Sequence, residues 1–383
     1  MQSVVPGRNS TTAKTASQKM RHRFHALCPY FAMFPEQFAE KWINRLTLPG
    51  EYVLDPFSGR GTTALSAVLL GRQAVSSDTN DVAYCLTFAK TNPPHYRTIR
   101  NRLQQLRDEY CANGADRSGE NLPVFFEWAF SRNTLPQLVF LRERLRWKRS
   151  KVDAMIAALV LGSLHGESRK SPTYLSNQMP RTISTKPDYS VRFWRSRDWH
   201  APDRDVFQLM EDRIEYRYVS FVPKAHSVVF HADMRKLPYL LDTHKLPVRC
   251  AITSPPYLDV TNYEEDQWLR LWFLGGPPYP TRNRLNSDDR HTQEGKYWSF
   301  VADMWRSLGA VLQKNAHIVL RIGSRRQSPE AIRSCLRHTS VKSGRRVHMV
   351  SSRTSEIRNR QTRAFSPGSL GCLLEVDCHF VMR

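Results

Sequence analysis

Long apolar segments are missing from this chain. No stretch approaches the ~20 consecutive apolar residues of a membrane-spanning helix, and residues 1–19 lack the apolar run of a signal peptide. Cys-x-x-Cys pairs are also missing: the seven cysteines are scattered, which argues against a zinc ribbon and a disulfide framework. The thirteen histidines form no ligand-spaced cluster. We therefore expect a cytoplasmic protein with reduced thiols, no membrane partner and no metal.

Acidic residues are scarce. The 383-residue chain has 57 Lys and Arg against 35 Asp and Glu, a formal net charge of +22 at pH 7. A polyanionic partner explains such an excess, because each phosphate that a cation neutralises releases a counterion. Residues 321–363 alone carry 12 Lys and Arg and 2 Asp and Glu. The alternatives are a solvated basic face and a basic enzyme that binds no nucleic acid.

Apolar strands and helices alternate in two parts of the chain. A short strand at 52–54 precedes a helix at 64–70, and a second strand at 73–77 precedes a helix at 82–90. This βαβα order predicts an α/β fold with a doubly wound parallel sheet. Strands are expected again at 227–230, 249–252 and 316–322. A weakly alternating segment at 373–381 is expected to close the sheet as an edge strand.

The rest of the chain departs from this order. Residues 1–24 are polar and show no periodicity, which predicts a disordered basic arm. Residues 95–225 combine helical segments with a polar, aromatic and basic stretch, so we interpret them as a largely helical insertion. Residues 25–94 and 226–383 then form the sheet domain.

A glycine loop follows the first strand. Two glycines let a backbone pass close to a bulky ligand, but a dinucleotide loop would need a third. The Asp55 carboxylate at the strand tip would repel a phosphate and suits an amino group. S-adenosylmethionine has an ammonium, a sulfonium and no phosphate. We expect Thr62 or Thr63 to cap the next helix; the alternative is an ordinary strand–turn–helix corner. The candidate cofactor-binding residues of this loop are Asp55, Pro56, Phe57, Gly59, Gly61 and Thr62.

Two more carboxylates follow strands. Asp78 lies at the end of the second strand, where an acidic residue typically binds ribose hydroxyls. Asp233 follows the strand at 227–230 and could accept a hydrogen bond from an adenine amino group. The alternatives are a helix cap for Asp78 and a surface carboxylate for Asp233.

The segment Thr253-Ser254-Pro255-Pro256-Tyr257 follows another strand. An exocyclic base amine is a poor nucleophile, because its lone pair is delocalised into the ring. The Ser254 hydroxyl and the Pro255 carbonyl could localise that lone pair by accepting hydrogen bonds from both N–H groups. Pro255 and Pro256 hold the backbone rigid and remove competing donors. Tyr257 offers a flat face to a base drawn out of the stack. A bland Ser-Pro-Pro turn is the alternative.

These two motifs, in this order, resemble those of the DNA amino-methyltransferases, which methylate cytosine N4 or adenine N6. Residues 55–63 are similar to the family's cofactor motif and residues 253–257 to its catalytic motif, in the variant most often associated with cytosine N4. The segment 29–35 resembles the family's N-terminal cofactor motif, which implies that Tyr30 and Phe34 help to enclose the cofactor. Arg60 departs from the small residue usual in the loop.

The resemblance implies a Rossmann-like, mostly parallel seven-stranded sheet and S-adenosyl-L-methionine as cofactor. It implies a site-specific DNA methyltransferase acting on cytosine N4, with double-stranded DNA as partner and residues 95–225 as the target-recognition region. A restriction–modification system, with a cognate restriction endonuclease, is typical of such enzymes. Adenine N6 in DNA, guanine N2 in RNA and a non-catalytic nucleic-acid-binding protein remain alternatives.

Overall fold

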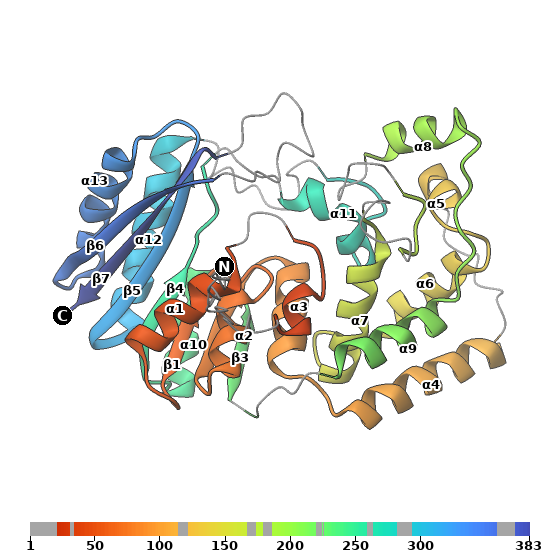
Figure 1. Ribbon diagram of the computed structural model, residues 1–383, viewed down its shortest axis with the longest axis horizontal. Helices are drawn as coiled ribbons and strands as arrows, with labels where there is room; N and C mark the ends of the chain where they lie inside the picture. Colours follow the sequence, from red (N-terminus) through yellow and green to blue (C-terminus); the bar gives the residue numbers. More distant parts are fainter. Residues whose placement is uncertain are drawn as a thin grey trace, which may run out of the picture.

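The computed structural model describes most of the chain (Figure 1). The described residues are 21–30, 34–113, 122–166, 174–178, 186–219, 224, 226–258, 263–281, 293–357 and 372–383. Most of the predicted basic arm therefore lies outside the described residues, as do residues 31–33 of the N-terminal motif, parts of the predicted insertion and residues 358–371 near the C-terminus.

The centre of the fold is a seven-stranded sheet in the order β3-β2-β1-β4-β5-β7-β6. The first five strands are parallel, and β7 pairs antiparallel with both β5 and β6. This confirms the predicted doubly wound, mostly parallel α/β fold. The strands are β1 (Tyr52–Asp55), β2 (Gln73–Asp78), β3 (Ser227–His231), β4 (Val248–Thr253), β5 (Leu312–Ser324), β6 (Val347–Glu356) and β7 (Leu374–Met382).

Successive side chains of the central strands point to opposite faces of the sheet, as a pleated strand requires. Val53 belongs to the core on one face, and Leu54 belongs to the core on the other. The first face is covered by α1 (Glu36–Leu46) and α2 (Thr62–Leu69). The second face is covered by α10 (Leu237–His244), α12 (Glu294–Val311) and α13 (Pro329–Ser340). Both faces are therefore buried, which explains the continuous apolar strands in the sequence.

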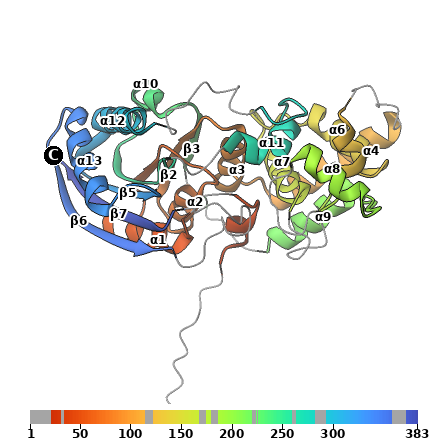
Figure 2. The same ribbon diagram turned by 90° about the horizontal axis from the view of Figure 1, so that it is seen from above.

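A helical region lies beside the sheet, at one end of the molecule in both views (Figures 1 and 2). It shares one apolar core with α3, which packs on α7. α11 follows β4 in the chain, yet it packs with α3, α6 and α7, so it joins this region from outside residues 95–225. The helices concerned are α3 (Asp81–Thr91), α4 (Tyr96–Asn113), α5 (Val124–Ala129), α6 (Thr134–Arg144), α7 (Lys151–Leu164), α8 (Pro187–Arg195), α9 (Val206–Arg217) and α11 (Tyr263–Phe273).

Short 3-10 turns complete the described secondary structure: η1 (Arg23–Ala26), η2 (Met234–Lys236) and η3 (Val341–Ser343). Among the described residues, no helix combines the length and the apolar character needed to cross a bilayer. The seven cysteines are all free thiols. The described residues contain no group of three or more His, Cys, Asp or Glu that could hold a metal ion.

Two details of the sequence-based expectation were wrong. β7 is not an edge strand, because β6 pairs with its outer side over Val347–Glu356. The residues of β6 are mostly exposed and polar, so no apolar alternation marks this strand in the sequence. The cap of α2 is Gly61, with no side-chain hydrogen bond, and Thr62 and Thr63 both lie inside the helix. Gly61 adopts a left-handed conformation there, and its carbonyl accepts the hydrogen bond of Leu65 N.

Candidate active site

The glycine loop makes a tight turn between β1 and α2. Gly59 has φ +49° and Gly61 has φ +73°, both in the left-handed region that favours glycine. A Cβ on Gly61 would lie 2.7 Å from Thr87 Oγ1, whereas a Cβ on Gly59 would lie 3.6 Å from the Tyr30 ring. The loop is thus packed on α3 at Gly61 and on the N-terminal segment at Gly59.

Asp55 ends β1 and is almost fully buried. One carboxylate oxygen accepts hydrogen bonds from Thr253 Oγ1 at 2.6 Å and from Phe57 N at 3.2 Å. Burial raises the pKa of Asp55 to about 6, and the nearby charge of Asp78 adds to the rise. No cation within the described residues pairs with this carboxylate in a salt bridge, so the site favours a positively charged ligand group.

Asp78 ends β2, next to β1 in the sheet. Its Oδ2 accepts a hydrogen bond from Gly59 N at 2.9 Å, and its Oδ1 accepts one from Asn80 N at 2.9 Å. Burial raises the pKa of Asp78, and these two hydrogen bonds oppose the rise. The helix cap of α3 is Asn80, whose side chain accepts from two backbone amides. Asp78 therefore orients the glycine loop and still has lone pairs for another donor.

The second motif begins where β4 ends, and β4 pairs with the other side of β1. The hydrogen bond from Thr253 to Asp55 joins the two motifs directly. The Ser254 hydroxyl donates to the Arg321 carbonyl at 2.9 Å. Pro255 is buried, and Ser254 and Pro256 are partly exposed. The parallel strands thus bring the cofactor and catalytic candidates to one edge of the sheet.

Tyr257 is buried against β5 and β7. Its hydroxyl donates to Glu375 Oε1 at 3.0 Å, and its ring lies so close to Gly323 that a Cβ there would be 2.5 Å from Tyr257 Cε2. Burial holds the pKa of Tyr257 well above its usual value, and the charge of Glu375 contributes. The tyrosine is therefore neutral and its ring orientation is fixed by the strands.

An ion-pair network that was not predicted from the sequence lies next to the loop at residues 253–257 and contacts it through Arg321 and Glu375. Arg321 donates two hydrogen bonds to the Asp377 carboxylate at 2.6 and 2.8 Å, and its Nη1 lies 3.2 Å from Glu375 Oε2. All three side chains are largely buried. A single arginine inside the apolar run of β5 is the sequence signal that could have revealed the network, because a buried charge needs a partner.

The other candidates lie around the glycine loop or beyond it. Tyr30 is buried beside Gly59, and Phe34 is buried against Phe38, with ring centroids 5.1 Å apart. Phe57 packs against Phe300 of α12 at 5.3 Å. The remaining contacts are the Pro56 carbonyl accepting from Ser77 Oγ at 3.1 Å and the Thr62 hydroxyl accepting from Arg60 Nε at 3.4 Å.

Asp233 follows β3, the strand beyond β2. Its carboxylate caps η2 by accepting from Arg235 N at 2.9 Å, and it also pairs with the Arg235 guanidinium at 2.9 and 3.0 Å. The structure therefore places Asp233 at the same edge of the sheet as Asp55 and Asp78, with its charge already shared by a neighbouring arginine.

Buried basic residues next to the loop were also missed. Lys90 is almost fully buried and donates to the Arg60 carbonyl at 2.5 Å. Burial holds its pKa well below the usual value, and the charge of Arg60 lowers it further. Burial also lowers the pKa of Arg60 to about 10 and that of His25 to about 2. Arg60, which departs from the family pattern, thus belongs to a group of buried basic residues next to the glycine loop.

The donor set fits S-adenosylmethionine. Two glycines at positive φ give a close backbone approach, and two carboxylates with raised pKa values stand at adjacent strand tips. Asp55 suits the ammonium group, Asp78 the ribose hydroxyls and Asp233 the adenine amino group. These individual roles remain predictions.

A model of a family described as DNA methylase matches residues 7–89 of this chain. The match includes the N-terminal segment, the glycine loop and Asp78. The match supports a relation of this chain to the DNA amino-methyltransferases and supports a methyltransferase activity. It also implies S-adenosylmethionine as the methyl donor. A search of curated proteins finds no match.

Solved structures of low identity also match. The rRNA methyltransferase aviRa from Streptomyces viridochromogenes is 12% identical, with a TM-score of 0.36, over 95% of this chain and 94% of that chain. TrmN from Thermus thermophilus is 12% identical, with a TM-score of 0.38, over 94% of this chain and 52% of that chain. An rRNA methylase from Streptococcus thermophilus is 8% identical, with a TM-score of 0.33, over 92% and 99%.

Proposed function

We propose that this chain, whose residues 7–89 are similar to the DNA methylase family, is a site-specific DNA methyltransferase. It transfers a methyl group from S-adenosylmethionine to the exocyclic N4 of a cytosine that is flipped out of double-stranded DNA. The single observation that carries the proposal is the 2.6 Å hydrogen bond between Thr253 and Asp55. It links the start of the amine-binding motif to the strand tip that suits the cofactor's ammonium group.

Ser254 and Pro255 act on the amine. The Ser254 proton is directed to the Arg321 carbonyl, and in the proposed complex Ser254 Oγ accepts from one N–H of the base. The Pro255 carbonyl accepts from the other N–H. Two such acceptors localise the nitrogen lone pair for an in-line displacement, which needs alignment and no covalent intermediate. The proton of the alkylated amine then passes to solvent.

Tyr257 and Pro256 position the base. The hydrogen bond to Glu375 fixes the Tyr257 ring, and we assign this ring to one side of the flipped base. A fixed ring lowers the entropic cost of holding the base in place. When bound, S-adenosylmethionine supplies the electrophilic methyl group. Asp55, Asp78 and Asp233, with the glycine loop, hold and orient it.

The test is to express the chain in a host without DNA methylation, digest the host DNA and RNA separately to nucleosides, and analyse both by mass spectrometry. We expect N4-methylcytosine in DNA, confined to one sequence context. The matched control is Ser254→Ala, which should fold and give none. N6-methyladenine would change the target base, methylated guanine in RNA alone would contradict the DNA substrate, and no modified base would contradict the enzyme.

Site-specific methylation protects DNA from an endonuclease with the same recognition sequence. We therefore propose a cognate restriction endonuclease as a partner of the methylated DNA. Host DNA that carries the modification should resist cleavage by that endonuclease, and DNA from cells with the Ser254→Ala variant should be cut.

A further inference from the structure

We propose that α8 and the turn that follows it form a DNA-contacting surface that stacks on bases and grips phosphates of the target. The inference rests on the proposed function, whose catalytic residues are far along the chain from α8. The α8 surface is defined by Trp128, Tyr189, Phe193, Arg195, Arg197 and Trp199.

Aromatic rings meet on the outer side of α8. Tyr189 and Phe193 are one helical turn apart, and their ring centroids lie 6.3 Å from each other. Trp199 packs edge-on against Phe193 at 5.5 Å. Tyr189 is 55% exposed and Trp199 is 44% exposed, so the cluster is open to solvent. Burying such rings is favourable, so a cluster of rings that stays exposed to water is typical of a binding site.

Arginines interleave with the rings. The Arg197 guanidinium lies 3.9 Å from the centroid of the Phe193 ring, and the Arg195 guanidinium lies 5.4 Å from that of the Trp128 ring. Both arginines are exposed and hold their charge against an aromatic face. Rings beside arginines bind nucleic acids in a recurrent way, because every base has a face to stack on and every nucleotide has a phosphate.

The turn after α8 is built to return the chain over this surface. Asp198 has φ +50°, a left-handed conformation that is uncommon for any residue but glycine. Trp199 N then donates to the Trp194 carbonyl at 3.0 Å, and the Trp199 carbonyl accepts from Asn177 Nδ2 at 2.7 Å. The exposed Trp199 ring is therefore carried on a backbone that is fixed at both sides.

The inner side of α8 packs on α5 and, through α5, on α11. Trp194 is fully buried and packs against Phe125 of α5 at 5.7 Å. Phe125 in turn packs against Trp268 of α11 at 5.0 Å, and α11 is the first helix after Tyr257 among the described residues. Figures 1 and 2 both show α11 between the sheet and α8. A continuous aromatic core thus fixes the α8 surface on the helical region that also contains α11.

DNA is the occupant that the charges favour. The chain carries a net charge of +22, and the segment 186–200 has four Lys and Arg against two Asp and Glu. A protein partner would also use aromatic rings and arginines, but it would need matching acidic surface and would leave the excess of positive charge unexplained. Phosphate contacts position a duplex, while stacked rings hold bases that leave the stack.

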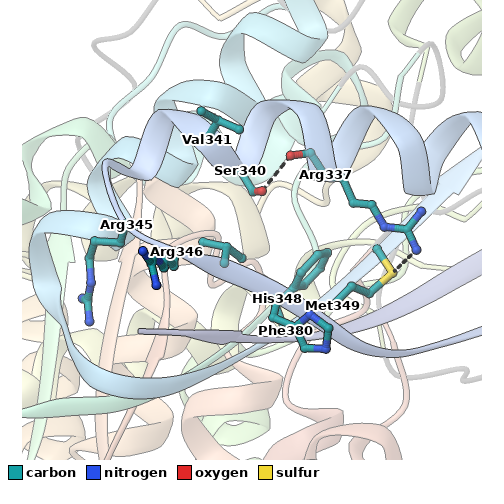
Figure 3. A pocket seen from close by; sticks show the side chains of 9 residues that line it. Arg337, Ser340, Val341, Arg345, Arg346, His348, Met349 and Phe380 are labelled. Atoms are coloured by element: carbon teal, nitrogen blue, oxygen red, sulfur yellow. Dashed lines mark hydrogen bonds between the residues drawn. The ribbon is translucent and has the colours of Figure 1, made fainter.

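Another basic site provides the control for charge. A cavity of about 470 Å3 lies between α13 and β6, with Arg337, Arg346 and His348 among its lining residues (Figure 3). Val347 pairs with Met382, which in turn pairs with Ala316 near the start of β5. The cavity is therefore near the amino end of β5, whereas Ser254 contacts Arg321 near its carboxyl end. Figure 1 places β6 and α8 at opposite ends of the molecule.

The experiment measures steady-state methylation of unmethylated genomic DNA by the full chain. Tyr189→Ala/Trp199→Ala removes the two most exposed rings and leaves the buried Trp194 in place. We expect the KM for DNA to rise by about fivefold or more, because each lost stacking contact weakens binding by roughly that factor. The kcat and the Kd for S-adenosylmethionine should stay within about twofold. Tyr239→Ala, which removes a 77% exposed ring on α10, is the matched control and should leave the KM unchanged.

A second pair separates charge from stacking. Arg195→Ala/Arg197→Ala should weaken binding of a duplex in fluorescence anisotropy and flatten its salt dependence, whereas Arg337→Ala/Arg346→Ala, with the same loss of charge, should do neither. Two results together would overturn the proposal. The first is an equal KM for Tyr189→Ala/Trp199→Ala and Tyr239→Ala, and the second is an equal salt slope for the two arginine double variants. Binding needs no turnover, so a chain that binds DNA through α8 but modifies no base would contradict the proposed function and keep this inference.

Discussion

At the scale of single residues, Asp55 shows a conflict between stability and function. Its carboxylate is buried without a cationic partner in the described structure, and burial raises its pKa to about 6 from 3.8. The folded state therefore binds a proton more tightly than the unfolded state. The free energy of unfolding falls as pH rises from about 4 to about 6, by an amount on the order of 3 kcal/mol.

Asp55→Asn should remove this penalty and keep the hydrogen bonds from Thr253 and Phe57. We expect the variant to unfold at a higher temperature than the wild type at about pH 8, with little difference at about pH 4.5. Calorimetry should also show a lower affinity for S-adenosylmethionine, because the amide cannot balance its ammonium group. A variant that is no more stable at pH 8, or that binds the cofactor normally, would contradict this role of Asp55.

The two glycines of the loop make a matched pair for a second prediction. Gly61→Ala places a Cβ 2.7 Å from Thr87 Oγ1 and 3.1 Å from Thr87 Cα, at φ +73°. We expect it to lower the free energy of unfolding by about 2 kcal/mol or more, through left-handed strain and the clash. Gly59→Ala meets only the Tyr30 ring at 3.6 Å, so its cost should be near the strain alone, about 1 kcal/mol.

Both variants can be measured by denaturant unfolding, and their cofactor affinities by calorimetry. Gly59 N donates a hydrogen bond to Asp78. Gly59→Ala should therefore reduce the free energy of S-adenosylmethionine binding more than it reduces the free energy of unfolding. Equal stability losses in the two variants would show that the packing on Thr87 does not distinguish them.

At the scale of elements, the Arg321 network ties the catalytic loop to the antiparallel end of the sheet. Arg321→Met would leave two carboxylates, Glu375 and Asp377, without their cation in a largely buried site. We expect it to lower the free energy of unfolding by about 3–5 kcal/mol. Adding Glu375→Gln and Asp377→Asn should recover most of that loss, since no buried charge is then unpaired.

The matched control is Arg353→Met. Arg353 stands opposite Asp377 on β6, but it is exposed. Its removal should change stability by less than about 1 kcal/mol. Similar losses for Arg321→Met and Arg353→Met would mean that the buried network does not hold β5 and β7 together.

The sequence predicted the elements whose burial leaves a pattern. β1, β2 and β4 are short apolar strands that end at polar motifs, and the parallel order of β/α units placed those motifs at one edge. β6 was missed because its residues are mostly polar and exposed, so β7 was placed at the edge instead. The cap of α2 was assigned to Thr62 or Thr63 because propensity favours them, while the turn geometry required Gly61.

The contacts within the site were predictable only in part. Strand order alone implies that Asp55 lies near Thr253, but it gives no hydrogen bond. The pairing of Arg321 with Glu375 and Asp377 depends on the antiparallel register of β5 and β7, which no local pattern records. The contact of Trp199 with Phe193 depends on the left-handed turn at Asp198, which no pattern in the polar, aromatic and basic stretch predicts.

At the scale of the whole molecule, the excess of positive charge is unevenly placed. Residues 329–356, which include α13 and β6, carry six Lys and Arg and two Glu. The helical region adds the exposed arginines of α8 at the other end of the molecule. A duplex that contacts one end leaves the other free, so only a fraction of the charge of +22 should enter a complex.

The salt dependence of duplex binding measures that fraction. The slope of log affinity against log salt is about −0.9 for each phosphate contact. We expect a slope corresponding to roughly six to ten contacts, which predicts a loss of about 10³–10⁵ in affinity between about 50 and 200 mM salt. Binding of S-adenosylmethionine, which has no phosphate, is the internal control and should change little over the same range. A slope near zero would assign the charge to solvated faces, and a slope close to twenty contacts would mean that both ends of the molecule bind DNA at once.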